Sequence, residues 1–220
     1  MGKIENSSGS VSIIGGSDGP TSVFIVGSKK KTVKQRIKKY LFNQRKKWYA
    51  DRIKPEAHTM VEVVEYVKNT YGFVEMPKED KRYQQEYQGL RASFIMQHAP
   101  ELLGEYAANP VLFSRDEEGV REFQKQVEIR QQKAMGISEE AFPVDFHVLS
   151  KVDEKAETYL YLESRFGYIG GSFRGHGKGS NRQFRKMYRD IHLYFGVTQE
   201  DIVNETQRYM ELLTTLSMKG

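Results

Sequence analysis

The sequence predicts a mainly α fold with a minor β component, an α+β chain whose body carries one or two short strands. A succession of segments repeats apolar residues with the period of an amphipathic helix and ends at Gly or Pro. Residues 142–150 (FPVDFHVLS) alternate as a strand does, and the β-branched runs within residues 11–26 surround a GGSDGP turn, which predicts a β-hairpin. With 220 residues, 13 Tyr and 12 Phe, the chain has enough bulk for a hydrophobic core.

The expected organisation is an N-terminal appendage, residues 1–54, followed by a helical body, residues 55–220. The appendage would hold the hairpin and a basic amphipathic helix over residues 29–53, and Pro55 lies where the basic composition ends. In the body, Gly and Pro stops and Ser or Thr caps predict helices over 56–70, 83–94, 114–136, 180–195 and 198–217. Residues 167–180 are expected to form a glycine- and arginine-rich loop, with Ser180 capping the helix that follows.

Several classes of protein are excluded by composition. The absence of cysteine rules out a disulfide-stapled scaffold, a thiolate nucleophile and a zinc site with Cys ligands. No apolar run reaches the roughly 18 residues that span a bilayer, and the N-terminus lacks the pattern of a signal peptide, so we expect a cytoplasmic protein. The histidines lack metal-site spacing, and we expect neither a cofactor nor a metal.

Positive charge is concentrated in two stretches. Between Lys29 and Lys54 there are 12 Lys or Arg residues against one acid, Asp51, and between Arg165 and Arg189 there are seven Lys or Arg residues and no acid. These stretches therefore carry +11 and +7, and because the net charge is +5, the rest of the chain carries −13. Clustered like charge repels itself unless an anion relieves it, so the pattern indicates an anionic partner.

The first basic stretch has three interpretations. Its helix could bind the phosphates of a nucleic acid or another polyanion, or rest on an anionic membrane with Val33, Ile37, Leu41 and Trp48 at the headgroup boundary. It could instead pack this apolar stripe on the body and leave a solvated basic face. The candidate phosphate-binding residues are Lys30, Lys31, Lys34, Lys38, Lys39, Arg45, Lys46 and Lys47.

The second basic stretch combines glycines with cations before a predicted helix. Backbone N–H groups at a helix start can hold phosphate, and the candidate residues are Arg174, His176, Lys178, Arg182 and Arg185. The glycine spacing fits neither a Walker A loop nor a Rossmann fingerprint. Incidental charge on a surface loop, and a catalytic loop with His176 as general acid, are the alternatives.

Residues 12–28, SIIGGSDGPTSVFIVGS, contain Gly15, Gly16, Asp18, Gly19, Pro20 and Thr21 in a dense pattern. The pattern resembles the GG-x-DGPT segment of the β subunit of sodium-ion-translocating decarboxylases, of which oxaloacetate decarboxylase is the best-known type. In that family the segment belongs to a many-helix membrane protein and its aspartate is implicated in sodium and proton handling. The resemblance implies such a role for Asp18. Sodium transport requires a path enclosed by spanning helices, which this sequence lacks, so the transport activity is not carried over. A structural hairpin or docking element, an element that inserts into a partner, and an ion site are the interpretations that stay open.

Together these observations favour a non-catalytic accessory protein that binds a polyanion, with nucleic acid as the leading candidate. The alternative is a peripheral membrane or complex-docking protein, associated with a sodium-pumping decarboxylase. An enzyme acting on a phosphorylated substrate at residues 167–180 is the third interpretation. The sequence does not predict an oligomeric state.

Overall fold

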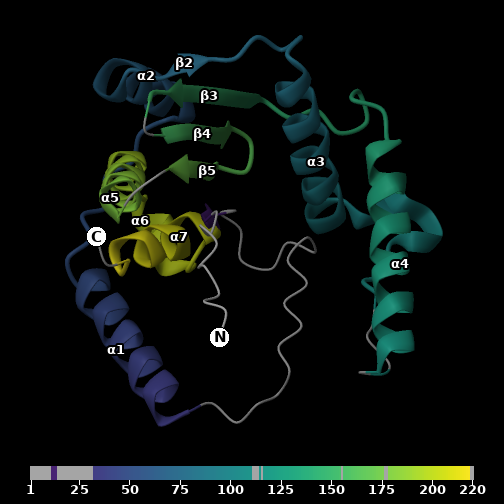
Figure 1. The fold of residues 1–220 in the computed structure, drawn as a ribbon, viewed down its shortest axis with the longest axis horizontal. Coiled ribbons are helices and arrows are strands. Elements are labelled where there is room, and N and C mark those ends of the chain that lie inside the picture. The colour runs from purple at the N-terminus through teal and green to yellow at the C-terminus, as the bar shows by residue number, and fades with distance from the viewer. Residues whose placement is uncertain are drawn as a thin grey trace, which may run out of the picture. The chain divides into compact units, whose positions relative to one another are not determined.

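The computed structural model describes residues 11–13, 32–110, 114, 116–154, 156–175 and 178–218. It confirms a mainly helical chain with an antiparallel sheet (Figure 1). The described residues form two compact units: residues 11–13, 32–76 and 146–218 make the larger, sheet-containing unit, and residues 77–145 make the helical unit. Most of the predicted hairpin lies outside the described residues; only Val11–Ile13 are described, and they form a strand.

All the strands described belong to one antiparallel sheet in the larger unit, with the order β1-β5-β4-β3-β2. The register of the three longest strands places Leu149 opposite Leu160, and Leu160 opposite Gly171. Four strands of the sheet lie in the body, where one or two were expected. Its members are β1 (Val11–Ile13), β2 (Val74–Glu75), β3 (Phe146–Val152), β4 (Ala156–Glu163) and β5 (Tyr168–Gly175).

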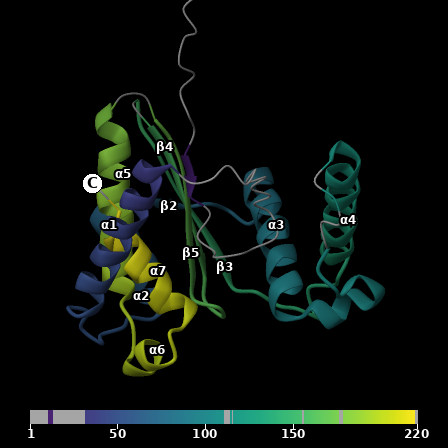
Figure 2. The same ribbon diagram turned by 90° about the horizontal axis from the view of Figure 1, so that it is seen from below.

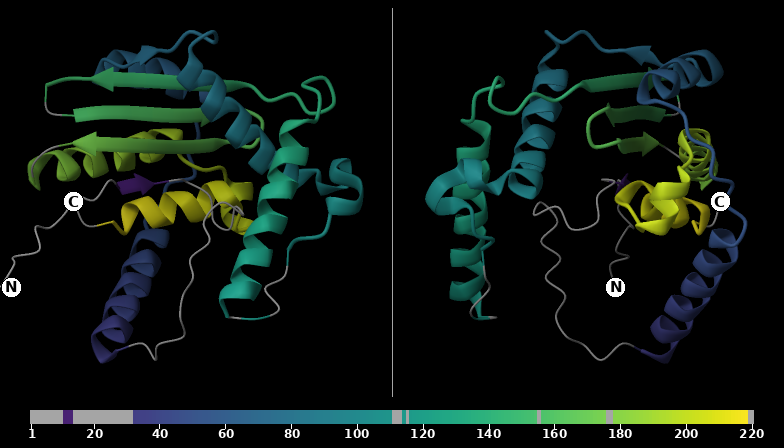
Figure 3. Two further views of the ribbon diagram at one scale, coloured as in Figure 1. Left: turned by 45° about the vertical axis from the view of Figure 1, so that its right-hand side comes forward. Right: turned by 180° about the vertical axis from the view of Figure 1, so that it is seen from behind.

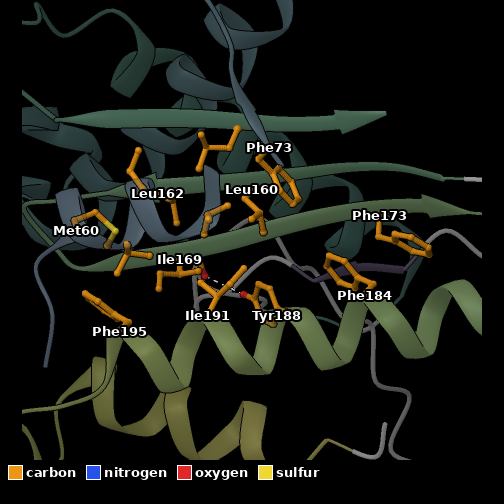
Figure 4. Packing of buried hydrophobic residues seen from close by; sticks show 14 residues of the cluster. Met60, Phe73, Leu160, Leu162, Ile169, Phe173, Phe184, Tyr188, Ile191 and Phe195 are labelled. Atoms are coloured by element: carbon orange, nitrogen blue, oxygen red, sulfur yellow. Dashed lines mark hydrogen bonds between the residues drawn. The ribbon is translucent and has the colours of Figure 1, made fainter. Parts of the chain in front are cut away.

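The helices of the larger unit are α1 (Val33–Ala50), α2 (Met60–Tyr71), α5 (Lys178–Phe195), α6 (Gln199–Val203) and α7 (Gln207–Leu216). Figure 2 shows the sheet nearly edge-on, with α2 and α5 on one side of it. Between them lies the main core, in which Val63 and Val67 of α2 and Ile191 of α5 pack against Leu160 and Leu162 (Figure 4). Gly72 ends α2 in a left-handed conformation, φ +68°, as the sequence predicts.

Gly171 of β5 leaves room for aromatic rings of α5. A Cβ atom on Gly171 would lie 3.2 Å from Leu160, 3.3 Å from Tyr188 and 3.4 Å from Phe184. The Tyr188 hydroxyl also donates a hydrogen bond of 2.9 Å to the carbonyl of Ile169. The prediction of a loop over residues 167–180 is therefore wrong for Tyr168–Gly175. Glycine is typical of turns, but here the missing side chain allows a helix to approach a strand closely.

The start of α5 also differs from the prediction. The helix begins at Lys178, so Ser180 lies within its first turn and is not the cap. At its other end α5 stops as expected, at Gly196, whose φ is +61°. A Cβ atom there would lie 1.8 Å from the carbonyl oxygen of Glu56, which explains why this position requires glycine.

Polar and aromatic contacts join α2 to α5. The hydroxyls of Tyr66 and Tyr71 both donate to the carboxylate of Asp190, at 2.6 and 2.5 Å. The ring of Tyr194 stacks between His58 and Tyr66, with centroid distances of 4.0 and 3.9 Å. His58 thus lies in a structural contact, as expected of a histidine without metal-site spacing.

A second core lies between α7 and the end of α1. It contains Val197, Tyr209, Leu212, Leu213 and Leu216, and the partly buried Tyr49, Ala50 and Ile53 pack against it. Arg208 of α7 donates from Nε to the carbonyl of Gly196 at 2.7 Å, and its guanidinium lies 3.5 Å from the ring centroid of Phe195. The single helix predicted over 198–217 is divided into α6 and α7, with Glu205 at φ +48° between them.

The helical unit contains α3 (Lys81–His98), a 3₁₀ segment (Pro100–Tyr106) and α4 (Glu117–Met135). Two buried arginines, Arg91 and Arg130, hydrogen-bond the carbonyls of its connecting segments. Their acceptors include the carbonyls of Ile137 at 2.9 Å and Phe142 at 3.0 Å for Arg91, and those of Tyr106 and Ala107, both at 3.0 Å, for Arg130. These side chains supply the hydrogen bonds that irregular backbone lacks.

His192 and Glu211 are among the ionisable groups of the larger unit whose pKa values are shifted by burial. His192 of α5 is buried, which lowers the pKa of its imidazole to about 3. Glu211 of α7 is half-buried, and burial raises the pKa of its carboxyl to about 7, although Gln207 donates to it at 2.9 Å. Folding therefore favours a neutral His192 and a neutral Glu211.

We expect Gly171→Val to lower the free energy of unfolding by about 1–3 kcal/mol, because its side chain would crowd Leu160 and Tyr188. Gly179→Ala in the first turn of α5 is the matched control, since nothing lies within 4 Å of its Cβ position, and we expect it to be neutral or slightly stabilising. Urea unfolding of both variants measures the difference. Equal stability of Gly171→Val and the parent would contradict the close packing of α5 on β5.

The contribution of Glu211 to stability should fall as pH rises from about 4.5 through 7, because its carboxyl must then ionise in a partly buried site, whereas the contribution of buried His192 rises with pH up to about 6.5. The shift from 4.5 to about 7 corresponds to roughly 3 kcal/mol above pH 7. Relative to the parent, Glu211→Gln should therefore gain stability as pH rises from 4.5 to 7, whereas Glu200→Gln, at an exposed position of α6, should follow the parent. Unfolding curves across this pH range measure both, and a difference between Glu211→Gln and the parent that does not change with pH would contradict the assignment.

Candidate functional site

The strongest concentration of exposed positive charge lies on α1. The helix begins at a capping box, in which Thr32 Oγ1 accepts from the backbone N–H of Gln35 at 3.3 Å and Gln35 Oε1 accepts from that of Thr32 at 2.9 Å. None of its 18 residues is buried, and none is acidic. The cations of α1 are Lys34, Arg36, Lys38, Lys39, Arg45, Lys46 and Lys47.

An apolar stripe runs along the same helix. Val33, Ile37, Tyr40, Leu41 and Trp48 recur at helical spacing, and we call them the α1 stripe. Each is between 51% and 72% exposed. Large apolar side chains aligned along a helix normally face a core, so their joint exposure marks an interaction surface.

The α1 stripe is separate from the face that attaches the helix. In the described part of the chain, Tyr49 and Ala50 in the last turn of α1 and Ile53 after it pack against the α7 core, and Figure 3 shows α1 meeting the rest of the unit at this end. Successive residues turn by about 100° around a helix, so Tyr49 points away from Trp48. The interpretation in which the stripe packs on the body is therefore not supported by the part of the chain that the structure describes.

Trp48 has its own cationic neighbour. The guanidinium of Arg52 lies 3.9 Å from the centroid of the indole, and its Nη1 donates to the Trp48 carbonyl at 2.9 Å. Arg52 was not among the residues singled out from the sequence. Arg52 lies in the turn that follows α1, and its spacing of four residues from an aromatic near the end of a helix is the signal that could have identified it.

The predicted residues of the second basic stretch are spread over two elements. Arg174 lies near the end of β5, where its Nη1 is 3.9 Å from Glu157 Oε2 on the adjacent strand. Arg182 and Arg185 lie on α5, the first exposed and the second half-buried, and Lys178 is the first residue of that helix. Phosphate binding by these residues stays a prediction. His176, Lys30, Lys31 and Asp18 lie outside the described residues.

A cavity of about 470 Å³ lies beside the first turns of α5. Its apolar lining includes Phe73, Phe173 and Phe184, and its charged lining is Lys151 and Asp153. The Lys151 ammonium donates to the carbonyl of Tyr71 at 2.7 Å. Among the described residues that line the cavity, one cation is thus balanced by one carboxylate.

The described residues do not assemble a metal site: no group of three His or carboxylate side chains among them is arranged to hold an ion. His147 Nδ1 lies 2.7 Å from Glu75 Oε1 on the neighbouring strand, and His192 is buried. None of the described helices combines the length and apolar character needed to cross a membrane.

Comparisons of the chain with protein-family models, with curated proteins and with solved structures found no match. The resemblance of residues 12–28 to the decarboxylase β subunit therefore stays a prediction, and the surface of α1 is the feature on which a function can be argued.

Proposed function

We propose that the protein is a non-catalytic docking protein that binds an anionic surface through α1. The observation that carries this proposal is the exposed helix itself, with seven cations, no acid and no buried residue. Exposed like charges at this density repel one another, and an anionic partner that neutralises them is stabilised by the release of its counterions.

The attachment of α1 suits this role. At 1.5 Å per residue the helix is about 27 Å long, and it is held by the α7 core only through the residues at its C-terminal end. A flat or grooved anionic surface could therefore contact α1 along most of the helix. Nucleic acids and anionic bilayers both present phosphates at this scale.

Nucleic acid, the leading candidate from the sequence, is supported by the cations and by aromatic side chains on which bases can stack, Tyr40 and Trp48. Association with a sodium-pumping decarboxylase depends on residues 12–28 and remains an expectation. The third interpretation required a catalytic loop at 167–180, and most of those residues belong to β5.

Charge variants of α1 test the proposal. Replacing the exposed Lys34, Lys38, Lys39 and Lys47 by Gln should reduce the salt dependence of binding, because each phosphate contact contributes about 0.7–0.9 to the slope of log affinity against log salt. A loss of about 3 in that slope is expected if all four residues contact phosphates. Titrations with single-stranded RNA at several salt concentrations measure this slope, and titrations with phosphatidylserine-containing vesicles show whether the variant also binds a bilayer more weakly.

The matched control replaces four exposed lysines of the helical unit, Lys78, Lys81, Lys125 and Lys133, by Gln. It removes the same charge from the chain and should leave the slope unchanged. An equal effect of both variants would show that binding follows net charge and not α1, and no binding of the parent to either partner would refute the proposal.

A further inference from the structure

The proposed function leaves one observation unexplained, which is the exposure of the α1 stripe. Contact with phosphates alone would use the cations and leave Val33, Ile37 and Leu41 in water. The partner should therefore offer an apolar layer as well as anionic groups, and both must extend along the helix.

The arrangement around the helix axis defines this partner further. With about 100° between residues, the α1 stripe occupies a sector about 100° wide, flanked by Lys34 and Arg45 on one side and by Arg36 and Lys47 on the other. A lipid interface has this layered order, with anionic headgroups above an apolar region. Long basic side chains beside an apolar face can extend toward the headgroups while their stems stay in apolar surroundings.

We infer that α1 lies in the plane of an anionic lipid bilayer, with the α1 stripe at the boundary between headgroups and acyl chains. This inference rests on the proposed function and names its partner. Cations on the remaining faces, such as Lys39 and Lys46, would lie within about one helix diameter of the headgroups. This distance is comparable with the screening length of about 8 Å at physiological salt, so these cations would still be attracted by the anionic headgroups.

Trp48 fits the same placement. Its ring is 51% exposed at one end of the stripe, and Arg52 lies over one face of it. Indole is apolar over most of its surface and polar at one edge, which suits the headgroup level of a bilayer. The attachment face, with Tyr49 and Ile53, points elsewhere, so the helix can lie flat without leaving the α7 core.

Trp48 is also the single tryptophan of the chain, so fluorescence excited at wavelengths that tyrosine does not absorb reports on this helix alone. We expect a blue shift when vesicles of phosphatidylcholine mixed with phosphatidylserine are added to the full chain, and quenching by lipids brominated in their acyl chains. Vesicles of phosphatidylcholine alone should bind at least about tenfold more weakly, because the headgroup attraction is lost.

The discriminating variant is the double change Ile37→Ser and Leu41→Ser, at exposed positions where folding should be little affected. We expect it to weaken vesicle binding at least about tenfold and to leave RNA affinity unchanged. Its matched control is Leu193→Ser with Val203→Ser, which removes two exposed apolar side chains from α5 and α6 and should bind vesicles like the parent. Circular dichroism confirms that each variant is folded.

The outcomes separate this inference from the proposed function. Salt-dependent binding to RNA without binding to anionic vesicles would overturn the bilayer inference and leave the proposed function standing, whereas binding to neither would refute both. Equal affinity for neutral and anionic vesicles would overturn the choice of an anionic bilayer. Trp48 that is already blue-shifted and protected from acrylamide without vesicles would show that another segment or a second copy covers the stripe, which also overturns the inference.

Discussion

The close contact of α5 with β5 is the constraint on which the larger unit depends. Tyr188 and Phe184 reach the sheet because Gly171 presents no side chain, and the hydroxyl of Tyr188 is satisfied by the carbonyl of Ile169. A tyrosine buried in a core needs such a partner for its hydroxyl. With α5 in place, α2 can pack beside it, and Asp190 joins the two helices through a pair of tyrosine hydroxyls.

The contact of α5 with β5 also helps to position α1, which it does not touch directly, through the helices between them. Arg208 of α7 binds the carbonyl of Gly196 at the end of α5, and the α7 core receives Tyr49 and Ile53 from the end of α1. The basic helix is thus positioned by a series of helices that starts at the sheet, although α1 itself buries no residue. Stability and binding are separated in this arrangement, because the residues proposed to meet the partner are not those that hold the fold.

Helical periodicity and its stops predicted most helices, since the pattern of a buried face and a glycine such as Gly72 act locally. The strand β5 was not predicted because a glycine that forms a turn cannot be distinguished in the sequence from one that makes room for a neighbouring ring. The cations of α1 could be predicted from the sequence, but the exposure of its stripe could not. Apolar residues recur at the same helical spacing whether their face packs on a core or is exposed to water. Charge counting also could not distinguish these cations from Arg91 and Arg130, whose guanidiniums are engaged with backbone carbonyls inside the helical unit.

The absence of a side chain at Gly171 has a consequence for how this sequence can change over generations. A larger residue at this position fits only if a neighbour becomes smaller, and the neighbours are Leu160 on β4 and Phe184 and Tyr188 on α5. These four positions form a coupled set, since the volume gained by one must be given up by another. Related chains should therefore exchange residues at these four positions together.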